Sequence, residues 1–224
     1  VRVEDTPVPE PGRGEILVRV ATVGICGTDV GEFVHGPRFF PLEAPHPHSG
    51  HFGPTIPGHE FSGWVVGVGD GVTGFAEGDL VGVGAGVACG ECPPCQEGQT
   101  NLCQSYWTVG LHSNGGLAEA AVIPASSSYN LSRFAITPDL AALTQPMSIA
   151  LHATRRGRVE DGERVVVLGA GGIGSFIVYA AAAAGANVTA MDLDPQRLAI
   201  ASRLGAVVIS DLSAPGPQEE LSAD

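Results

Sequence analysis

Residues 165–174 read VVVLGAGGIG, and this stretch decides the fold of the second half of the chain. Four apolar residues run directly into a turn with glycine at positions 169, 171, 172 and 174, and an apolar segment over 172–184 follows. A buried strand that turns tightly into a helix begins a βαβ unit. Downstream, 187–192 has the pattern of a strand, 195–204 of a helix and 206–210 of a third strand. The sequence therefore predicts βαβαβ, half of a doubly wound parallel sheet.

The first half of the chain has a different pattern. Up to about residue 135, short Val-rich runs such as 16–20 and 64–68 are separated by Gly, Pro, Asp and Asn, which is typical of a compact β domain. Helix signals are few before the segment 138–156, where apolar residues recur at helical spacing and Asp139 can serve as the cap. We therefore expect a β domain that is joined by a helix to the βαβαβ segment.

Composition excludes several classes of function. Asp and Glu number 24 against 11 Lys and Arg, so the formal net charge is −13 and the chain would repel a nucleic-acid backbone. The uncharged run 165–191 is long enough for a membrane span, but its glycines favour a buried βαβ unit. The first residues carry no signal-peptide pattern, so we expect a cytoplasmic protein that binds neither nucleic acid nor membranes.

Four of the five cysteines form a local cluster with the spacing C-x2-C-x2-C-x7-C: Cys89, Cys92, Cys95 and Cys103. Such short intervals let backbone turns direct several thiolates at one tetrahedral zinc, with Zn–S distances of about 2.3 Å. Iron–sulfur clusters use other spacings, disulfides would require an oxidising compartment, and a nucleic-acid-binding ribbon conflicts with the acidic balance. We predict a structural zinc site.

The fifth cysteine, Cys26, lies in the block Gly-Ile-Cys-Gly-Thr-Asp, and His59 and Glu60 follow about thirty residues later. Alone, a cysteine is more often a small buried hydrophobic residue than a ligand, and a His-Glu pair is common. Together the three offer a thiolate, an imidazole and a carboxylate. Three protein ligands with an open fourth position are the pattern of a catalytic zinc.

Four motifs follow one another along the chain. They are the block Cys26-Gly27-Thr28-Asp29, the string Gly58-His59-Glu60-Phe61-Ser62-Gly63 with Gly69 and Val72 after it, the four-cysteine loop and the glycine turn. In this order they resemble the zinc-containing alcohol dehydrogenase family of the medium-chain dehydrogenase superfamily. Segments 32–41 and 145–148 are most similar to its butanediol, sorbitol and threonine dehydrogenase branch. The resemblance covers nearly the whole chain.

The resemblance implies an α/β plus β fold: a GroES-like, zinc-binding catalytic domain over residues 1–150, then a partial Rossmann NAD-binding domain over 151–224. It also implies two zinc ions, one structural and one catalytic. Cys26 and His59 would bind the catalytic zinc, Glu60 would ligate it or lie beside it, and Asp29 would orient His59. Thr28 would pass the alcohol proton outward, although a strand threonine without a special role is the alternative.

The cofactor residues follow from the second half. Glycines at the strand–helix turn allow a pyrophosphate to approach the helix N-terminus: Gly169, Gly171, Gly172 and Gly174. Asp192 ends the next strand and is expected to bind both ribose hydroxyls of NAD. Because Leu193 and Asp194 supply no cation for a 2′-phosphate, NAD is favoured over NADP.

Three features depart from the family. Gly31 stands where the branch usually has a histidine that completes the proton relay, and Gln145 stands where it usually has a glutamate before Pro, available as another zinc ligand. Three Rossmann strands are present where six are expected, so a homo-oligomer is expected only if the full-length chain carries the missing strands.

We interpret the chain as an NAD-dependent enzyme that oxidises a secondary alcohol, diol or polyol, or reduces the matching ketone. The alternatives are a noncatalytic or degenerate zinc-binding relative and, less favoured, a reductase that keeps the structural zinc alone. His46, His48 and His51 are expected in a solvated loop, with substrate gating as the alternative, and His112 and His152 receive no role.

Overall fold

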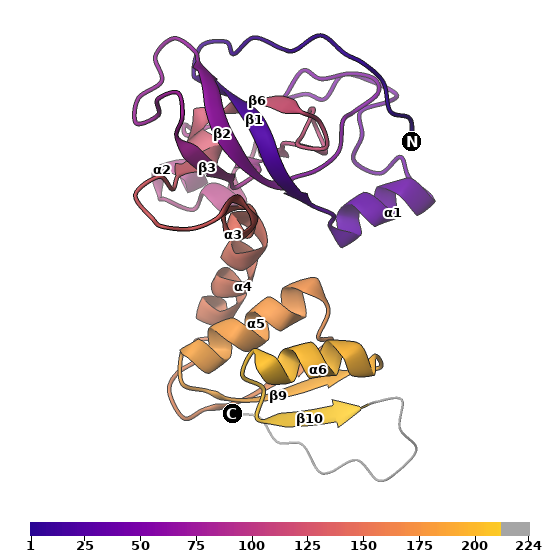
Figure 1. Ribbon diagram of the computed structural model, residues 1–224, viewed down its shortest axis with the longest axis vertical. Coiled ribbons are helices and arrows are strands. Elements are labelled where there is room, and N and C mark those ends of the chain that lie inside the picture. Colours follow the sequence, from indigo (N-terminus) through magenta and orange to yellow (C-terminus); the bar gives the residue numbers. More distant parts are fainter. Residues whose placement is uncertain (212–224) are drawn as a thin grey trace. The chain divides into compact units, whose positions relative to one another are not determined.

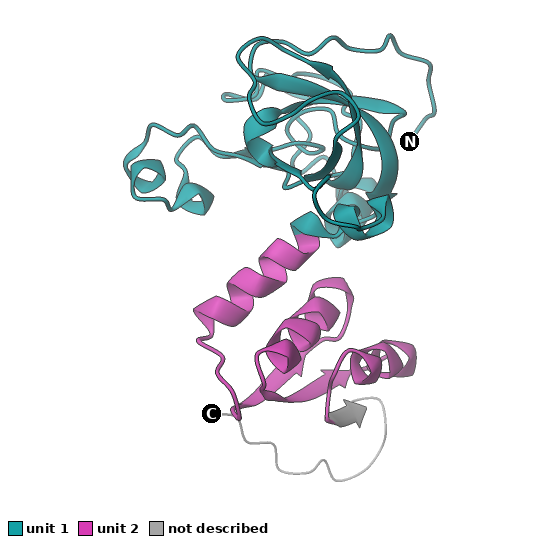
Figure 2. Ribbon diagram, turned by 60° about the vertical axis from the view of Figure 1, so that its left-hand side comes forward, with its two compact units in different colours: residues 1–145 teal, residues 146–224 magenta. Residues whose placement is uncertain are grey.

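The computed structural model describes residues 1–211 and divides the chain into two compact units, residues 1–145 and 146–224 (Figures 1 and 2). The sequence predicts this boundary five residues later, after residue 150. The loop expected over 211–224 lies, apart from Asp211, outside the described residues. Among the helices of residues 1–211, none combines the length and the apolar character needed to cross a membrane.

The first unit is built on a five-stranded antiparallel sheet with the order β6-β1-β2-β3-β7. Its strands are β1 (Glu15–Gly24), β2 (Glu60–Val68), β3 (Leu80–Val83), β6 (Ala120–Pro124) and β7 (Ser128–Asn130). A second ladder pairs β4 (Gly86–Val87) with β5 (Trp107–Thr108). Between these two strands lie the short helices α2 (Pro93–Gln96) and η1 (Thr100–Leu102), and η2 (Ala125–Ser127) precedes β7.

Alternate residues of the long strands form the core of this unit. On β1, Ile16 and Val18 are completely buried, and Phe61 and Val65 of β2 pack into the same cluster. This alternation is what the Val-rich runs predict for a half-buried sheet. Burial of these side chains fixes the register, because a slip of one residue would turn them outward.

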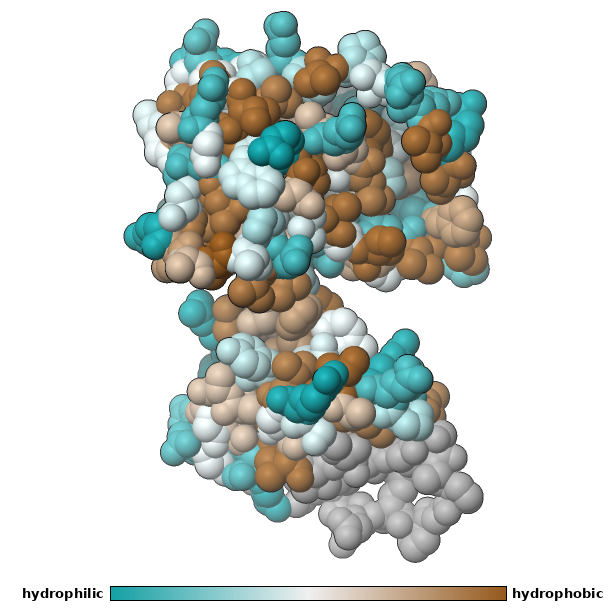
Figure 3. Space-filling view, in the orientation of Figure 1, coloured by the Kyte–Doolittle hydropathy of each residue, from teal (hydrophilic) through white to brown (hydrophobic). Residues whose placement is uncertain are grey.

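The helix α1 (Gly27–His35) connects the end of β1 to the loop that follows, and the sequence did not predict it. Its inward face is acidic, because Asp29 and Glu32 are buried. Its outward residues Val30, Phe33 and Val34 are exposed, and hydrophobic surface covers this edge of the first unit in Figure 3. An amphipathic pattern normally places the apolar face inward, so this reversed helix gave no recognisable signal.

The segment 138–156 forms two helices where the sequence predicts one. The helix α3 (Pro138–Ala142) ends at Leu143, and α4 (Thr144–Arg156) then begins with Pro146 in its first turn. Pro146 has no N–H to continue the hydrogen-bond ladder of a preceding turn, but it is tolerated in a first turn. The cap is also different from the expected one. Thr137 accepts the Leu140 N–H, whereas Asp139 accepts a hydrogen bond from Thr22 at 2.6 Å.

The second unit contains a three-stranded parallel sheet with the order β10-β9-β8. Its elements are β8 (Arg164–Leu168), α5 (Gly172–Ala183), β9 (Asn187–Asp192), α6 (Pro195–Arg203) and β10 (Val208–Asp211). The helices α5 and α6 pack on the sheet over a core that includes Val167, Val178 and Val188. The predicted βαβαβ order is confirmed, with element ends shifted by up to two residues.

Gly63 permits the close approach of β1 and β2. A Cβ atom at Gly63 would overlap the carbonyl oxygen of Arg19, whereas a Cβ at Gly67, on the same strand, would meet the Leu17 Cβ at 3.3 Å. The overlap at Gly63 can be relieved only by moving the backbone of β1, whereas the contact at Gly67 needs a shift of a few tenths of an ångström, so the cost of an added methyl group differs between these two sites.

We expect Gly63→Ala to lower the free energy of unfolding by about 2 kcal/mol or more, because the β1–β2 ladder must separate. Gly67→Ala is the matched control and should change it by no more than about 0.5 kcal/mol. Chemical denaturation of the two variants measures the difference. Equal stabilities would show that the β1–β2 spacing does not depend on Gly63.

Candidate metal centres and cofactor site

Cys26, the first residue of the first candidate centre, lies directly before the helix α1. Cys26 is the N-cap and has an extended backbone, with φ −86° and ψ 157°. Asp29 Oδ2 accepts the Cys26 backbone N–H at 2.8 Å. An acidic side chain in the first turn also interacts favourably with the positive end of the helix dipole. Asp29 therefore fixes both the start of the helix and the position of the cysteine.

His59 and Glu60 lie where the chain enters β2. The preceding Gly58 has a φ of +96°, which favours glycine, and a Cβ at this position would lie 2.9 Å from the Leu117 nitrogen. The turn 110–116 packs against the same backbone, since the Gly116 N–H donates to the Gly58 carbonyl at 2.8 Å. Glycines in both segments thus allow two backbones to meet directly beneath His59.

The structure brings Cys26, His59 and Glu60 together, with one ligand atom from each within 4.8 Å of the others. His59 is buried, and Cys26 and Glu60 are half-buried. Burial raises the pKa of the Cys26 thiol, although hydrogen bonds to Thr28 oppose the increase. A metal ion that binds here must replace this proton, as metal binding to cysteine generally does.

Asp29 connects two of these residues. Its Oδ1 lies 3.5 Å from His59 Nδ1, and both atoms are buried without an ordinary hydrogen bond to any described residue. Burial would raise the pKa of Asp29, but its contacts with His59 and with the Cys26 N–H hold that pKa below the usual value. A carboxylate at Nδ1 leaves Nε2 of His59 to face a metal ion, which is the usual outer support of a histidine ligand.

Thr28 lies beside this centre. Its Oγ1 is 3.7 Å from Cys26 Sγ, and its side chain is half-buried. Gly31 is on the same helix, and nothing lies within 4 Å of a Cβ placed there, so the local packing leaves room for a larger residue. Gln145 lies in the first turn of α4.

The second candidate centre is the loop between β4 and β5. The sulfur atoms of Cys89, Cys92, Cys95 and Cys103 lie within 4.8 Å of one another, and all four cysteines are free. Backbone N–H groups point at the sulfurs: Cys89 N donates to Cys103 Sγ at 3.3 Å, and Cys92 N to Cys89 Sγ at 3.4 Å. Four sulfurs at this spacing suit a closed tetrahedral site.

Acidity within this loop is uneven. Hydrogen bonds from the backbone of Gln104 and Cys95 lower the pKa of Cys92 to about 6, and the N–H of Cys89 lowers the pKa of Cys103. Burial raises the pKa of Cys95 to about 12, and the neighbouring Cys92 sulfur adds to this effect. Cys92 and Cys103 thus lose their protons more easily than Cys95, and a dication would stabilise the thiolate charge on all four.

The glycine turn of the second unit has the form expected for a phosphate-binding loop. Gly169 has a φ of +90°, and a Cβ at Gly174 would overlap the Gly169 carbonyl oxygen. Gly171 is the N-cap of α5, and Gly172 is its first residue. The first amides of α5 therefore follow a turn that only glycine fits, as in loops that bind pyrophosphate.

Asp192 ends β9 and supports this turn. Its Oδ2 accepts the Ala170 N–H at 2.7 Å, and its Oδ1 accepts the Asp194 N–H at 2.9 Å. The hydrogen bond from Asp194 is the main reason why the pKa of Asp192 lies below its usual value. Arg197 Nη1 lies 3.7 Å from Asp192 Oδ1. The two residues that follow Asp192 in the sequence do not reveal this cation, because Arg197 lies in the first turn of α6.

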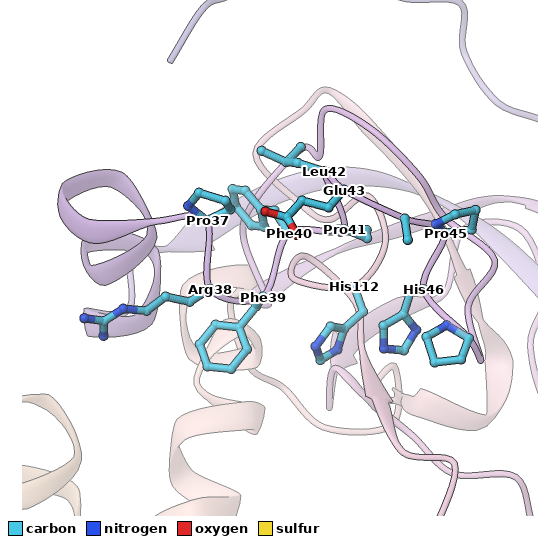
Figure 4. Close-up of a pocket in the computed structure, with 12 residues that line it drawn as sticks. Pro37, Arg38, Phe39, Phe40, Pro41, Leu42, Glu43, Pro45, His46 and His112 are labelled. Carbon is cyan, nitrogen blue, oxygen red and sulfur yellow. The ribbon is translucent and has the colours of Figure 1, made fainter.

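Two histidines that received no definite role also come together. The rings of His46 and His112 stack with their centroids 4.4 Å apart (Figure 4). Both residues are half-buried, although most of the loop around His46 is exposed, as expected for a solvated loop. The stacked pair belongs to a hollow lined by residues 37–47 and His112. No local spacing could have revealed a pair so distant in sequence.

Comparisons with known proteins agree with this architecture. The sequence model described as "Alcohol dehydrogenase GroES-like domain" matches residues 12–133. The chain is 37% identical over 190 residues to L-galactonate-5-dehydrogenase of Escherichia coli K12; the match covers 85% of this chain and 52% of that relative.

Solved structures give the same result. The crystal structure of 2R,3R-butanediol dehydrogenase from Bacillus subtilis superposes with a TM-score of 0.86 at 35% identity, over 95% of this chain and 60% of that one. A zinc-binding dehydrogenase from Sinorhizobium meliloti 1021, bound to NADP, has a TM-score of 0.81 at 33% identity, over 93% of this chain and 57% of that one. The chain thus spans between half and two thirds of the length of these proteins.

We expect Cys103→Ser to remove one equivalent of zinc and to lower the melting temperature, because the four-sulfur site would lose a ligand from a buried position. Cys26→Ser is the matched control: it should reduce metal content through the other centre and leave the four-cysteine loop intact. Elemental analysis with thermal unfolding measures both effects. Full metal content and an unchanged melting temperature in Cys103→Ser would exclude zinc at this loop.

Proposed function

Because the chain belongs to the alcohol dehydrogenases with a GroES-like domain, whose sequence model matches more than half of it, we propose that it is a zinc-dependent oxidoreductase. In this proposal it transfers hydride between NAD(H) and a secondary alcohol or the matching ketone. The observation that carries the proposal is the convergence of Cys26, His59 and Glu60 above the buried carboxylate of Asp29. Three ligands of these types leave a position open for substrate.

Two zinc ions are proposed, with different tasks. Cys26 and His59 would hold the catalytic ion, with Glu60 as a third ligand, and the four cysteines of the loop would hold a structural ion. The buried, otherwise unpartnered Asp29 Oδ1 and His59 Nδ1 favour this assignment. The contact between Asp29 and His59 becomes more favourable when His59 Nε2 binds a cation, because the imidazole then carries more positive charge toward the carboxylate.

When bound, zinc would supply Lewis acidity toward the alcohol oxygen and the nicotinamide would accept hydride. The chain's own residues would orient the zinc ligands and transfer the proton. Asp29 holds Cys26 through its backbone N–H and orients His59. Thr28, adjacent to the thiol, is placed to take the proton from substrate. Since residue 31 is glycine, the onward path from Thr28 would pass through water or through a histidine of the loop that carries His46, His48 and His51.

The substrate proposed is a small molecule: a secondary alcohol, and in particular a vicinal diol or polyol. The similarity to enzymes named for butanediol and L-galactonate supports this class. The net charge of −13 disfavours nucleic acid as a partner. A cytoplasmic location and a homo-oligomer remain predictions.

For the cofactor, we propose NAD bound at Gly169, Gly171, Gly172 and Gly174, with Asp192 at the adenosine ribose. The buried Asp192 carboxylate favours ribose hydroxyls over a 2′-phosphate. Two observations oppose a strict preference. Arg197 lies beside Asp192, and a similar structure is bound to NADP.

A noncatalytic relative is the second candidate, and Gln145 and Gly31 favour it. An amide is a weaker zinc ligand than a carboxylate, and glycine cannot relay a proton. A reductase with the structural zinc alone is less favoured, since the three metal-ligating side chains of Cys26, His59 and Glu60 would then converge without binding a metal ion.

We expect the purified protein, supplied with zinc and NAD, to form NADH from vicinal diols, followed by absorbance. Cys26→Ser should lower the rate at least about 100-fold, because a ligand and its charge are lost. Gln145→Glu should increase zinc retention against a chelator, and Gln196→Glu, which adds the same charge at an exposed position of α6, should not. If the full-length protein, assayed with zinc added, shows no turnover and Gln145→Glu changes neither its metal retention nor its activity, the noncatalytic candidate replaces the enzyme.

We expect Asp192→Ala to weaken NAD binding about 10-fold or more, since hydrogen bonds to a charged group are lost, and to weaken NADP binding less. Arg197→Leu should weaken NADP binding more than NAD binding. Dissociation constants from calorimetry give both ratios, and thermal unfolding monitors the loss of the Ala170 contact. An unchanged NAD to NADP ratio in Asp192→Ala would remove Asp192 from the ribose site.

A further inference from the structure

The loop 37–53, which follows α1, is fastened to the first unit at two places. The first is Glu32, which lies near the end of α1. This residue is buried, with only 7% of its surface exposed. Both of its oxygens accept the Arg38 N–H, at 2.9 and 3.1 Å, and Oε1 also accepts the Phe39 N–H. This attachment holds the beginning of the loop.

The second attachment is the stacked pair His46 and His112. Their rings are inclined by 23°, and Phe39 meets His112 edge to face with a centroid distance of 6.1 Å. Figure 4 shows the His46 and His112 rings side by side, with Phe39 next to His112. Ser49 also donates its hydroxyl hydrogen to the His112 carbonyl. The pair therefore joins the far part of the loop to the turn 108–113.

Hydrogen bonds define the protonation state that this arrangement requires. His46 Nδ1 accepts the backbone N–H of Ser49 at 3.2 Å and faces that of His48 at 3.4 Å. His112 Nδ1 accepts the Thr108 N–H at 3.0 Å. An imidazole nitrogen accepts a hydrogen bond only when it carries no proton. Both rings must therefore be neutral, with the proton on Nε2.

We propose that His46 and His112 form an acid-sensitive latch, which holds the loop 37–53 against the turn 108–113 when both rings are neutral and releases it when either ring is protonated. Protonation at Nδ1 turns an acceptor into a donor that faces a backbone N–H. It also places a positive charge on one member of a stacked pair. Both changes oppose the closed arrangement, and neither depends on the proposed reaction.

The charged surroundings do not cancel this effect. His48 stands edge-on to His46 at 5.9 Å, and Arg38 and Glu43 line the same hollow. Burial lowers the pKa of both rings, His48 adds to the effect on His46, and His46 adds to the effect on His112. Glu32 raises the pKa of His112, but as the smallest of the contributions.

Because the pKa of both rings is lowered in the folded protein, the closed loop is less stable at acid pH. A base whose pKa is lower in the folded than in the unfolded state takes up fewer protons when folded. The closed loop is therefore fully stabilised above the unfolded value of about 6.5, and this stabilisation is lost as the pH falls through that value toward the lowered pKa of the folded rings.

Hydrogen–deuterium exchange of residues 37–53 tests the latch. After correction for intrinsic exchange, we expect exchange at about pH 5 to be about fivefold faster than at about pH 7.5, which is the effect of losing one ordinary hydrogen bond. Side-chain nitrogen NMR of the parent protein should find both rings protonated at Nε2 at the higher pH. Equal exchange at the two pH values, or a proton on Nδ1 of either ring, would overturn the proposal.

Two variants separate the latch from general acid sensitivity. The double variant His46→Phe, His112→Phe keeps two flat rings without titratable nitrogens, so its loop should exchange at one rate at both pH values. His48→Phe removes a histidine of the same loop and should keep the pH dependence of the parent. A pH effect that survives in the double variant contradicts the latch. If the double variant does not fold, NMR and exchange of the parent still decide.

Discussion

The carboxylate of Asp29 is the constraint on which the candidate metal centre depends. One oxygen accepts the N–H of Cys26 at the first turn of α1, and the other faces His59 at the entrance to β2. A single buried side chain thus aligns the end of β1, the start of a helix and the start of β2. A buried charge of this kind is costly unless it is compensated, and here the helix terminus and His59 provide the compensation. The same helix carries Glu32, so both of its buried side chains are acidic.

Much of the fold could be predicted from the sequence wherever the signal was local and periodic. The run that leads into the glycine turn predicts β8 and α5, and the alternating Val residues predict the sheet of the first unit. The helix α1 could not be predicted, because it buries acids and exposes Val30, Phe33 and Val34. The break between α3 and α4 was missed because Pro146 was counted within a helix rather than at the start of one.

The candidate site divides along the same line. The four cysteines lie within fifteen residues, so their spacing alone indicates that they converge. Cys26 and His59 come from segments that meet through the β1–β2 ladder and through Asp29, and their pairing required a family resemblance in addition to chemistry. The contact of Arg197 with Asp192 arises from the geometry of α6, and the stacking of His46 on His112 joins residues 66 positions apart. No pattern in the sequence predicts either contact.

The four-cysteine loop is inserted between β4 and β5, two short strands that pair with each other through Gly86 with Thr108 and Val87 with Trp107. All of its candidate ligands belong to this one excursion, and the ladder closes the excursion at its base. The loop is thus a self-contained module, whose closure does not involve the ligands at Cys26 and His59. A change in the length of this loop, or in its ligands, would therefore leave in place both the hydrogen bond between Asp29 and Cys26 and the contact between Asp29 and His59.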